Sequence, residues 1–102
     1  PPAEIVADGD RRQVVTREGQ DVTRAFENGA LAAAAEAALH GVRVAVLKSG
    51  SPSCGSSFVY DGTFSKTRVA GDGVATALLR QRGIAVFSEL ELEAAAEYLA
   101  SL

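Results

Sequence analysis

The chain has 102 residues, which suits one small domain, and 47% of them are hydrophobic, enough to form a single core. Its 10 basic and 13 acidic residues give a net charge of -3 with no basic stripe, which argues against a nucleic-acid polymer as the main partner. The single cysteine excludes an internal disulfide, and the sequence shows neither a transmembrane stretch nor a signal peptide. We therefore expect a cytoplasmic protein without a membrane partner.

The chain begins with Pro1-Pro2-Ala3-Glu4 and contains no methionine. Such an extended, proline-led start is typical of a segment that continues from upstream sequence. We expect residues 1–102 to be a single α/β domain that forms the C-terminal two-thirds of a longer chain. Part of any functional site would then precede Pro1.

The first half of the sequence predicts a strand, a turn and a long helix. Residues 13–16 have strand character, and residues 17–20 are typical of a turn. The alanine-rich stretch 22–40 has high helix propensity, with Asp21 as its N-cap and Gly41 as its stop. Its small apolar residues recur at helical spacing, so we expect this helix to pack closely against a sheet.

An apolar run from Val42 to Leu47 predicts a parallel strand that is buried on both faces. The run Ser-Pro-Ser-Cys-Gly-Ser-Ser follows at residues 51–57 and contains the only cysteine. Residues 58–65, with a turn at Asp61-Gly62, predict either a small hairpin or an ordered excursion.

The last third of the chain predicts a helix, a strand and a second helix. We expect Asp72 to be the N-cap of a helix that runs from Val74 to a stop at Gly83, followed by a strand over residues 84–87. Ser88 and Glu91 have the spacing of a capping box for a final helix that ends near residue 99. A phosphate site at Gly71-Asp72-Gly73 is the weaker interpretation, because the aspartate would repel an anion.

This order of elements predicts a three-layer, Rossmann-like α/β domain with a mostly parallel sheet. Ligands bind beyond the carboxyl ends of the strands in such sheets, where residues 48–57 and 88–89 would lie. The topology therefore directs attention to Cys54.

A reactive cysteine needs a nearby cation, amide donors or a metal to become a thiolate. Lys48 is a possible cation, the amides of residues 55–57 are possible donors, and Pro52 would hold the Ser51 hydroxyl near Cys54. The alternative is a small, partly buried cysteine without chemistry, which the residues by themselves slightly favour. No Cys/His pair and no zinc-type spacing is present.

Two motifs carry a more specific signal: Ser51-Pro52-Ser53-Cys54-Gly55 and Tyr60-Asp61-Gly62-Thr63-Phe64. Shorter matches accompany them at residues 1–5, 14–16, 21–23, 47–48 and 71–74. In this order they resemble a bacterial family long catalogued as a domain of unknown function, which includes the thiouracil desulfidases. The resemblance covers nearly the whole chain.

The resemblance implies that the full-length protein binds a [4Fe-4S] cluster through three cysteines and removes sulfur from a thiolated nucleobase or nucleotide. Cys54 matches one cluster ligand and Ser51 matches the family's catalytic serine, while Lys48 and Ser53 are expected to contact the substrate. Two further cysteines and an acidic catalytic residue would precede Pro1. We therefore expect this chain alone to lack the cluster and to be inactive.

Two alternatives stay open beside the desulfidase. One is a cluster-free sulfur-transfer enzyme in which Cys54 carries a persulfide. The other is a non-catalytic ligand-binding module in which the cysteine loop is only structural.

Overall fold

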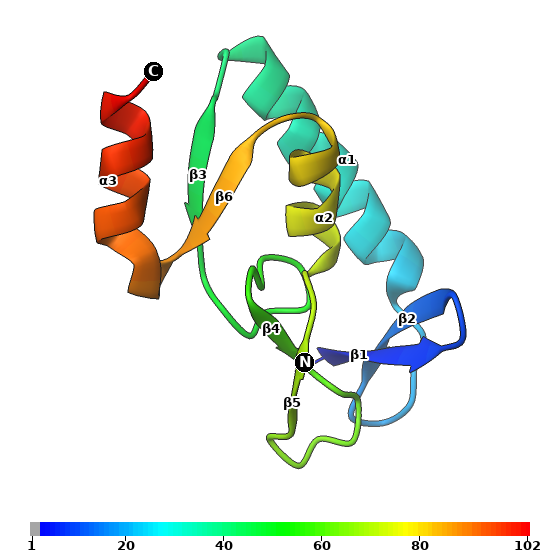
Figure 1. Cartoon of the computed structure of the whole chain (residues 1–102). Coiled ribbons are helices and arrows are strands. Elements are labelled where there is room, and N and C mark those ends of the chain that lie inside the picture. Colours follow the sequence, from blue (N-terminus) through cyan, green and yellow to red (C-terminus); the bar gives the residue numbers. More distant parts are fainter. Residues whose placement is uncertain (1–2) are drawn as a thin grey trace.

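The structure is a computed structural model and describes residues 3–102, so Pro1 and Pro2 of the first matching motif lie outside the described residues. In chain order the elements are β1 (Ala3–Asp8), β2 (Arg11–Thr16), α1 (Thr23–Leu39), β3 (Val44–Leu47), β4 (Phe58–Tyr60), β5 (Arg68–Ala70), α2 (Val74–Gln81), β6 (Ala85–Ser88), a 3₁₀ turn (Glu89–Glu91) and α3 (Leu92–Ala100) (Figure 1). They form a small mixed α/β domain.

The strands form three separate two-stranded sheets. β1 pairs with β2 and β4 with β5, both antiparallel, because the connection within each pair is too short for the crossover that a parallel pair needs. β3 and β6 form the one parallel pair within residues 3–102, with Val44 opposite Ala85 and Leu47 opposite Ser88. The predicted three-layer, Rossmann-like domain with a mostly parallel sheet is therefore not confirmed.

The parallel pair β3–β6 nevertheless lies between helices (Figure 1). On one face, Ala45 and Leu47 pack against a buried cluster that includes Ala34 of α1 and Leu79 of α2. On the other face, β3 and β6 both contact α3. Helices thus contact both faces of this single parallel pair.

The strand predicted at residues 13–16 is confirmed as part of β2, whereas no strand was expected for its partner β1. The two strands align Ile5 with Val14, and both side chains are buried. Alanine, glutamate and aspartate make up four of the six residues of β1 and have low strand propensity, so the pairing with β2 decides the conformation.

The predicted long helix is confirmed as α1, but its partner and its cap differ from the prediction. α1 packs mainly along α2 rather than against a sheet, with the buried residues Ala30 and Ala34 allowing close approach (Figure 1). The N-cap is Val22, and Asp21 precedes it, accepting a hydrogen bond from the Thr23 amide at 2.9 Å.

The predicted buried strand is shorter and more exposed than expected. β3 begins at Val44 instead of Val42, and its parallel direction is confirmed. Burial on both faces is wrong, because the side chain of Val46 is 44% exposed. The physical reason is that β3 has one neighbouring strand in the described part of the chain, so one of its edges is open.

For residues 58–65 the sequence predicted either a small hairpin or an ordered excursion. The structure shows a hairpin, but its second strand is β5 and not residues 63–65. The intervening loop is held by Glu4 of β1, whose carboxylate accepts the amides of Gly62 at 3.0 Å and Phe64 at 3.1 Å. Phe64 adopts a φ of 58°, a left-handed conformation that these contacts help to hold.

The end of the chain follows the prediction closely. Ser88 and Glu91 form both hydrogen bonds of the capping box, and α3 begins after the short 3₁₀ turn. Among the helices of residues 3–102, none is both long and apolar enough to cross a bilayer.

Candidate functional site

The candidate site is at the carboxyl ends of β3 and β6, which meet at one edge because the strands are parallel. Ser49 follows β3, and Glu89 follows β6. The Glu89 carboxylate accepts the Ser49 amide at 2.8 Å and also the Ser49 hydroxyl. These hydrogen bonds, the hydroxyl first and the amide second, lower the pKa of Glu89 from its ordinary value of 4.5 to about 2.

Beyond Ser49, the backbone folds around the side chain of Ser51. Its Oγ accepts hydrogen bonds from the amides of Ser53 at 3.1 Å and Cys54 at 3.0 Å. The Gly55 amide donates to the Ser51 carbonyl at 2.8 Å, which closes the turn. Ser51 therefore shapes the loop that presents Cys54.

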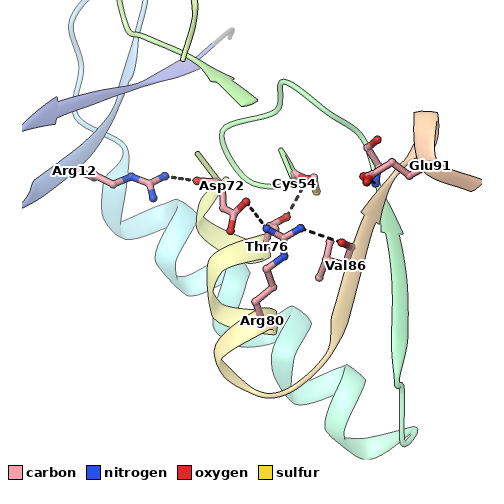
Figure 2. Close-up of polar contacts among 8 residues, drawn as sticks. Arg12, Cys54, Asp72, Thr76, Arg80, Val86 and Glu91 are labelled. Atoms are coloured by element: carbon pink, nitrogen blue, oxygen red, sulfur yellow. Dashed lines mark hydrogen bonds and ion pairs between the residues drawn. The ribbon is translucent and has the colours of Figure 1, made fainter. Parts of the chain in front are cut away.

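The cysteine loop, residues 50–57, is docked on the N-terminus of α2. The amide of Gly73 donates to the Gly55 carbonyl at 2.7 Å, that of Val74 to Pro52 at 2.7 Å, and those of Ala75 and Thr76 to Ser53 at 2.9 and 3.1 Å. Thr76 is fully buried, and its hydroxyl donates to the Cys54 carbonyl at 2.9 Å (Figure 2). The loop carbonyls thus satisfy the amides that the first turn of a helix leaves unpaired.

A phosphate bound at Gly71-Asp72-Gly73 would need the free amides at the N-terminus of α2. These amides already donate to carbonyls of the cysteine loop, so they are not free to bind an anion. The predicted N-cap role of Asp72 is wrong, because Gly73 is the N-cap and makes no side-chain cap. The Asp72 carboxylate instead accepts the guanidinium of Arg80 at 2.7 Å, and Arg12 donates to the Asp72 carbonyl (Figure 2). Both arginines fix the segment that leads into α2.

Aromatic side chains lie beside the start of the cysteine loop. Gly50 forms a bridge to Val59 of β4, and a β-carbon at Gly50 would lie 3.0 Å from the Tyr60 ring. Phe58 and Tyr60 pack edge to face, with ring centroids 5.9 Å apart. Because the Arg68 guanidinium lies 4.3 Å from the centroid of the Phe58 ring, this corner combines aromatic surface with positive charge.

The predicted site residues lie together, since all belong to one loop and its approach. Cys54 is a free, partly buried thiol, Ser53 is partly buried, and Lys48 is exposed. Lys48 also lies close enough to Glu89 for its positive charge to contribute to the low pKa of that carboxyl.

Sequence patterns assigned no role to the Ser56 hydroxyl or to the side chains of Glu89 and Tyr60. Ser56 is only 5% exposed, and its Oγ has no hydrogen-bond partner among residues 3–102. The signal for Glu89 was present, because the sequence placed residues 88–89 at this edge, but its contact with Ser49 spans 40 positions. The position of Tyr60 against Gly50 depends on the Gly50–Val59 bridge, which no local pattern predicts.

Fold and site together define a class: a small mixed α/β domain that presents one thiol from a serine-rich loop, where a parallel strand meets a helix N-terminus. Within the described residues, no group of three or more His, Cys, Asp or Glu side chains is arranged to hold a metal ion.

The sequence profile of the 2-thiouracil desulfurase family matches residues 1–91, and the chain belongs to this family. The resemblance predicted from the motifs is thereby confirmed.

Two relatives place the chain within this family. The uncharacterized protein YbbK of Bacillus subtilis (strain 168) is 46% identical over 80 residues, which are 78% of this chain and 53% of YbbK. The solved structure of the [4Fe-4S]-dependent thiouracil desulfidase TudS matches with a TM-score of 0.91 and 47% identity, over 100% of this chain and 65% of TudS. The chain thus spans about half the length of the curated relative and less than two thirds of TudS.

Replacing Gly73 by alanine should separate the cysteine loop from α2. The new β-carbon would overlap the Ser53 carbonyl group and lie 2.9 Å from the Cys54 amide nitrogen, although the backbone of Gly73 is one that alanine adopts readily. We expect Gly73→Ala to lower the free energy of unfolding by about 2 kcal/mol in urea titrations. We also expect faster hydrogen exchange of the Ala75 and Thr76 amides.

The matched control is Gly29→Ala in α1, where a β-carbon meets nothing within 4 Å. It should keep or raise the free energy of unfolding by about 0.5–1 kcal/mol, because alanine favours helix. Equal stability of the two variants would contradict the close docking of the loop.

The Ser49–Glu89 contact predicts a specific dependence on pH. Because the folded state lowers the pKa of Glu89, the contact stabilises the protein above pH 4.5, and this contribution is lost as the pH falls toward about 2. An NMR titration of the Glu89 carboxyl carbon should give a midpoint near 2. Ser49→Ala should raise that midpoint, because it removes the largest cause, and a wild-type midpoint of 4.5 would show that the contact is absent.

Proposed function

We propose that residues 1–102 form the C-terminal two-thirds of an iron–sulfur desulfidase, which removes sulfur from a thiolated pyrimidine base or nucleotide with Cys54 as one ligand of a [4Fe-4S] cluster. One observation carries this proposal: the whole chain matches the [4Fe-4S]-dependent thiouracil desulfidase TudS with a TM-score of 0.91 and 47% identity. The portion of TudS outside the match would correspond to the remainder of the protein.

The residues of the loop fit the part of one cluster ligand. Soft thiolates are the usual ligands of such clusters, and Cys54 supplies one thiol at a strand end. Ser56, two positions further on, has a buried hydroxyl without a partner among the described residues, so it has a hydrogen free to donate to a sulfur atom. Residues 3–102 contain no complete group of metal ligands. The other cluster ligands would therefore have to come from outside these residues.

A bound cluster of this kind would supply an open iron that acts as a Lewis acid toward the sulfur of the substrate. Overall, the oxygen of water replaces the thiocarbonyl sulfur, which leaves as hydrogen sulfide, so no external oxidant or reductant is needed. The protein must supply protons in the right place for this exchange.

Ser51 is suited to hold such a proton at its Oγ. Two backbone amides donate to this oxygen, from Ser53 and Cys54, and neither bond uses the hydroxyl hydrogen. The same two donors would stabilise negative charge on the oxygen after the proton has left. We assign Ser51 the role of a proton donor. We assign Lys48, which directly follows β3, and Ser53 of the loop to substrate binding because they lie on either side of Ser51 in the chain.

The test is anaerobic reconstitution of the full-length protein with iron and sulfide, followed by an assay of sulfide release from thiouracil. Cys54→Ala should lose the visible absorbance of the cluster and reduce sulfide release to background. Ser57→Ala, which changes an exposed residue of the same loop, should keep both. Activity that persists in Cys54→Ala, or after removal of iron from the wild type, would refute the proposal, and the second result would favour the persulfide alternative.

Ser51→Ala should separate proton transfer from cluster binding. We expect it to retain the cluster absorbance and to lower kcat by about 100-fold, the range typical of a lost general acid. Ser51→Thr keeps an Oγ and should recover part of the rate. Circular dichroism spectra should first establish that each variant folds, because the Ser51 side chain also shapes the loop; a kcat equal to that of the wild type would remove Ser51 from the mechanism.

A further inference from the structure

The two strands of the parallel pair present outer edges of different character. The Ala85 amide of β6 donates to the Arg43 carbonyl at 3.1 Å, so the backbone groups of Arg43 point toward β6. In a parallel ladder both groups of a residue point the same way, and successive residues alternate. Ala45 and Leu47 therefore also face β6, whereas Val44 and Val46 direct their amides and carbonyls to the other edge of β3.

The outer edge of β6 is blocked by side chains. By the same alternation its outward residues are Val86 and Ser88. The Val86 carbonyl accepts a hydrogen bond from Arg80 at 3.0 Å (Figure 2). The Ser88 amide donates to the Glu91 carboxylate at 2.8 Å. Charged groups on the ladder positions prevent a further strand from joining there.

Among residues 3–102, no side chain hydrogen-bonds to the outer edge of β3, and this edge lies beside an apolar groove. The groove has a volume of about 550 Å³ and is formed by valines of the β3 segment and leucines of α3 and the C-terminus, among them Val42, Val44, Val46, Leu92, Leu99 and Leu102. Val46 is 44% exposed and Leu92 is 61% exposed. Arg43 is the one charged residue that residues 3–102 contribute to the groove lining.

We propose that the outer edge of β3 binds an extended apolar strand of the same polypeptide, supplied by the portion in which the relatives exceed this chain. Parallel strands are normally buried on both faces and occur in sheets of more than two strands. The match covers 53% of YbbK and 65% of TudS. The part of each relative outside the matched region is therefore long enough to provide a strand. This inference rests on the likeness to longer relatives and not on the desulfidase chemistry.

The blocked edge of β6 makes the direction of growth unambiguous. A strand added at β3 would pair with the amides and carbonyls of Val44 and Val46. Its side chains would continue the apolar face that these two valines share with α3. The sheet would then extend toward the mostly parallel arrangement that the sequence predicts.

Amide hydrogen exchange followed by NMR tests this docking residue by residue. In the 102-residue chain, Val44 and Val46 should exchange at least tenfold faster than Ala45 and Leu47, which bond to β6. In the full-length protein all four amides should be protected to a similar degree. Equal exchange of Val44 and Val46 in the two proteins would overturn the proposal, as would protection in the short chain that rises with its concentration, which would assign the edge to a second copy.

A pair of variants of the full-length protein locates the contact. Val46→Arg places a charge in the groove and should increase the exchange rate of the Val44 amide at least tenfold. Leu90→Arg makes the same kind of change at a residue that is 78% exposed and lies outside the groove, and it should leave that rate unchanged. If both variants behave alike, the groove is not the docking site. Because the readout is exchange and not sulfide release, failure here is distinguishable from failure of the desulfidase proposal.

Discussion

Backbone hydrogen bonds between the cysteine loop and the first turn of α2 determine the arrangement of the site. Carbonyls of Pro52, Ser53 and Gly55 accept the amides that the helix leaves free at its start. Each such bond contributes about 1 kcal/mol, and together they orient the loop more strictly than its own sequence would. Through Arg80, which binds both Asp72 and the Val86 carbonyl, the same helix is tied to β6. The thiol, the helix and the parallel pair are thus fixed relative to one another.

Local sequence patterns predicted those parts of the fold whose stability is local. Helix propensity determines α1, and the capping box at Ser88 and Glu91 places the start of the last helical segment. β1 and β5 were not predicted, because their conformation depends on partners elsewhere in the chain. The loop before β5, for example, is held by Glu4, which lies 58 positions before Gly62. Predicting a mostly parallel sheet from the element order assumed neighbouring strands that the described residues do not contain.

The residues of the candidate site also fall into two groups: those that a local motif predicts and those that depend on contacts distant in sequence. Cys54 and Ser51 were accessible from the sequence because one short motif contains both, and the family match confirms the resemblance that the motif suggested. Glu89 follows β6 and Tyr60 belongs to β4, so they lie near the cysteine loop only through the β3–β6 pairing and the Gly50–Val59 bridge. The unpaired hydroxyl of Ser56 could not be found at all without the packing around it, since the sequence shows merely another serine.

The cysteine loop is held by hydrogen bonds to the rest of the protein, so its conformation would not depend on whether a metal centre is bound. Among residues 3–102, the backbone contacts that shape the loop come from Ser51, Thr76, Gly73 and the first amides of α2, together with the bridge between Gly50 and Val59. The conformational entropy of ordering Cys54 is therefore lost during folding and not during metal uptake. For the cluster proposed above, oxidative loss of the metal would therefore leave the Cys54 loop in the same conformation, and a new cluster could bind without refolding of the loop.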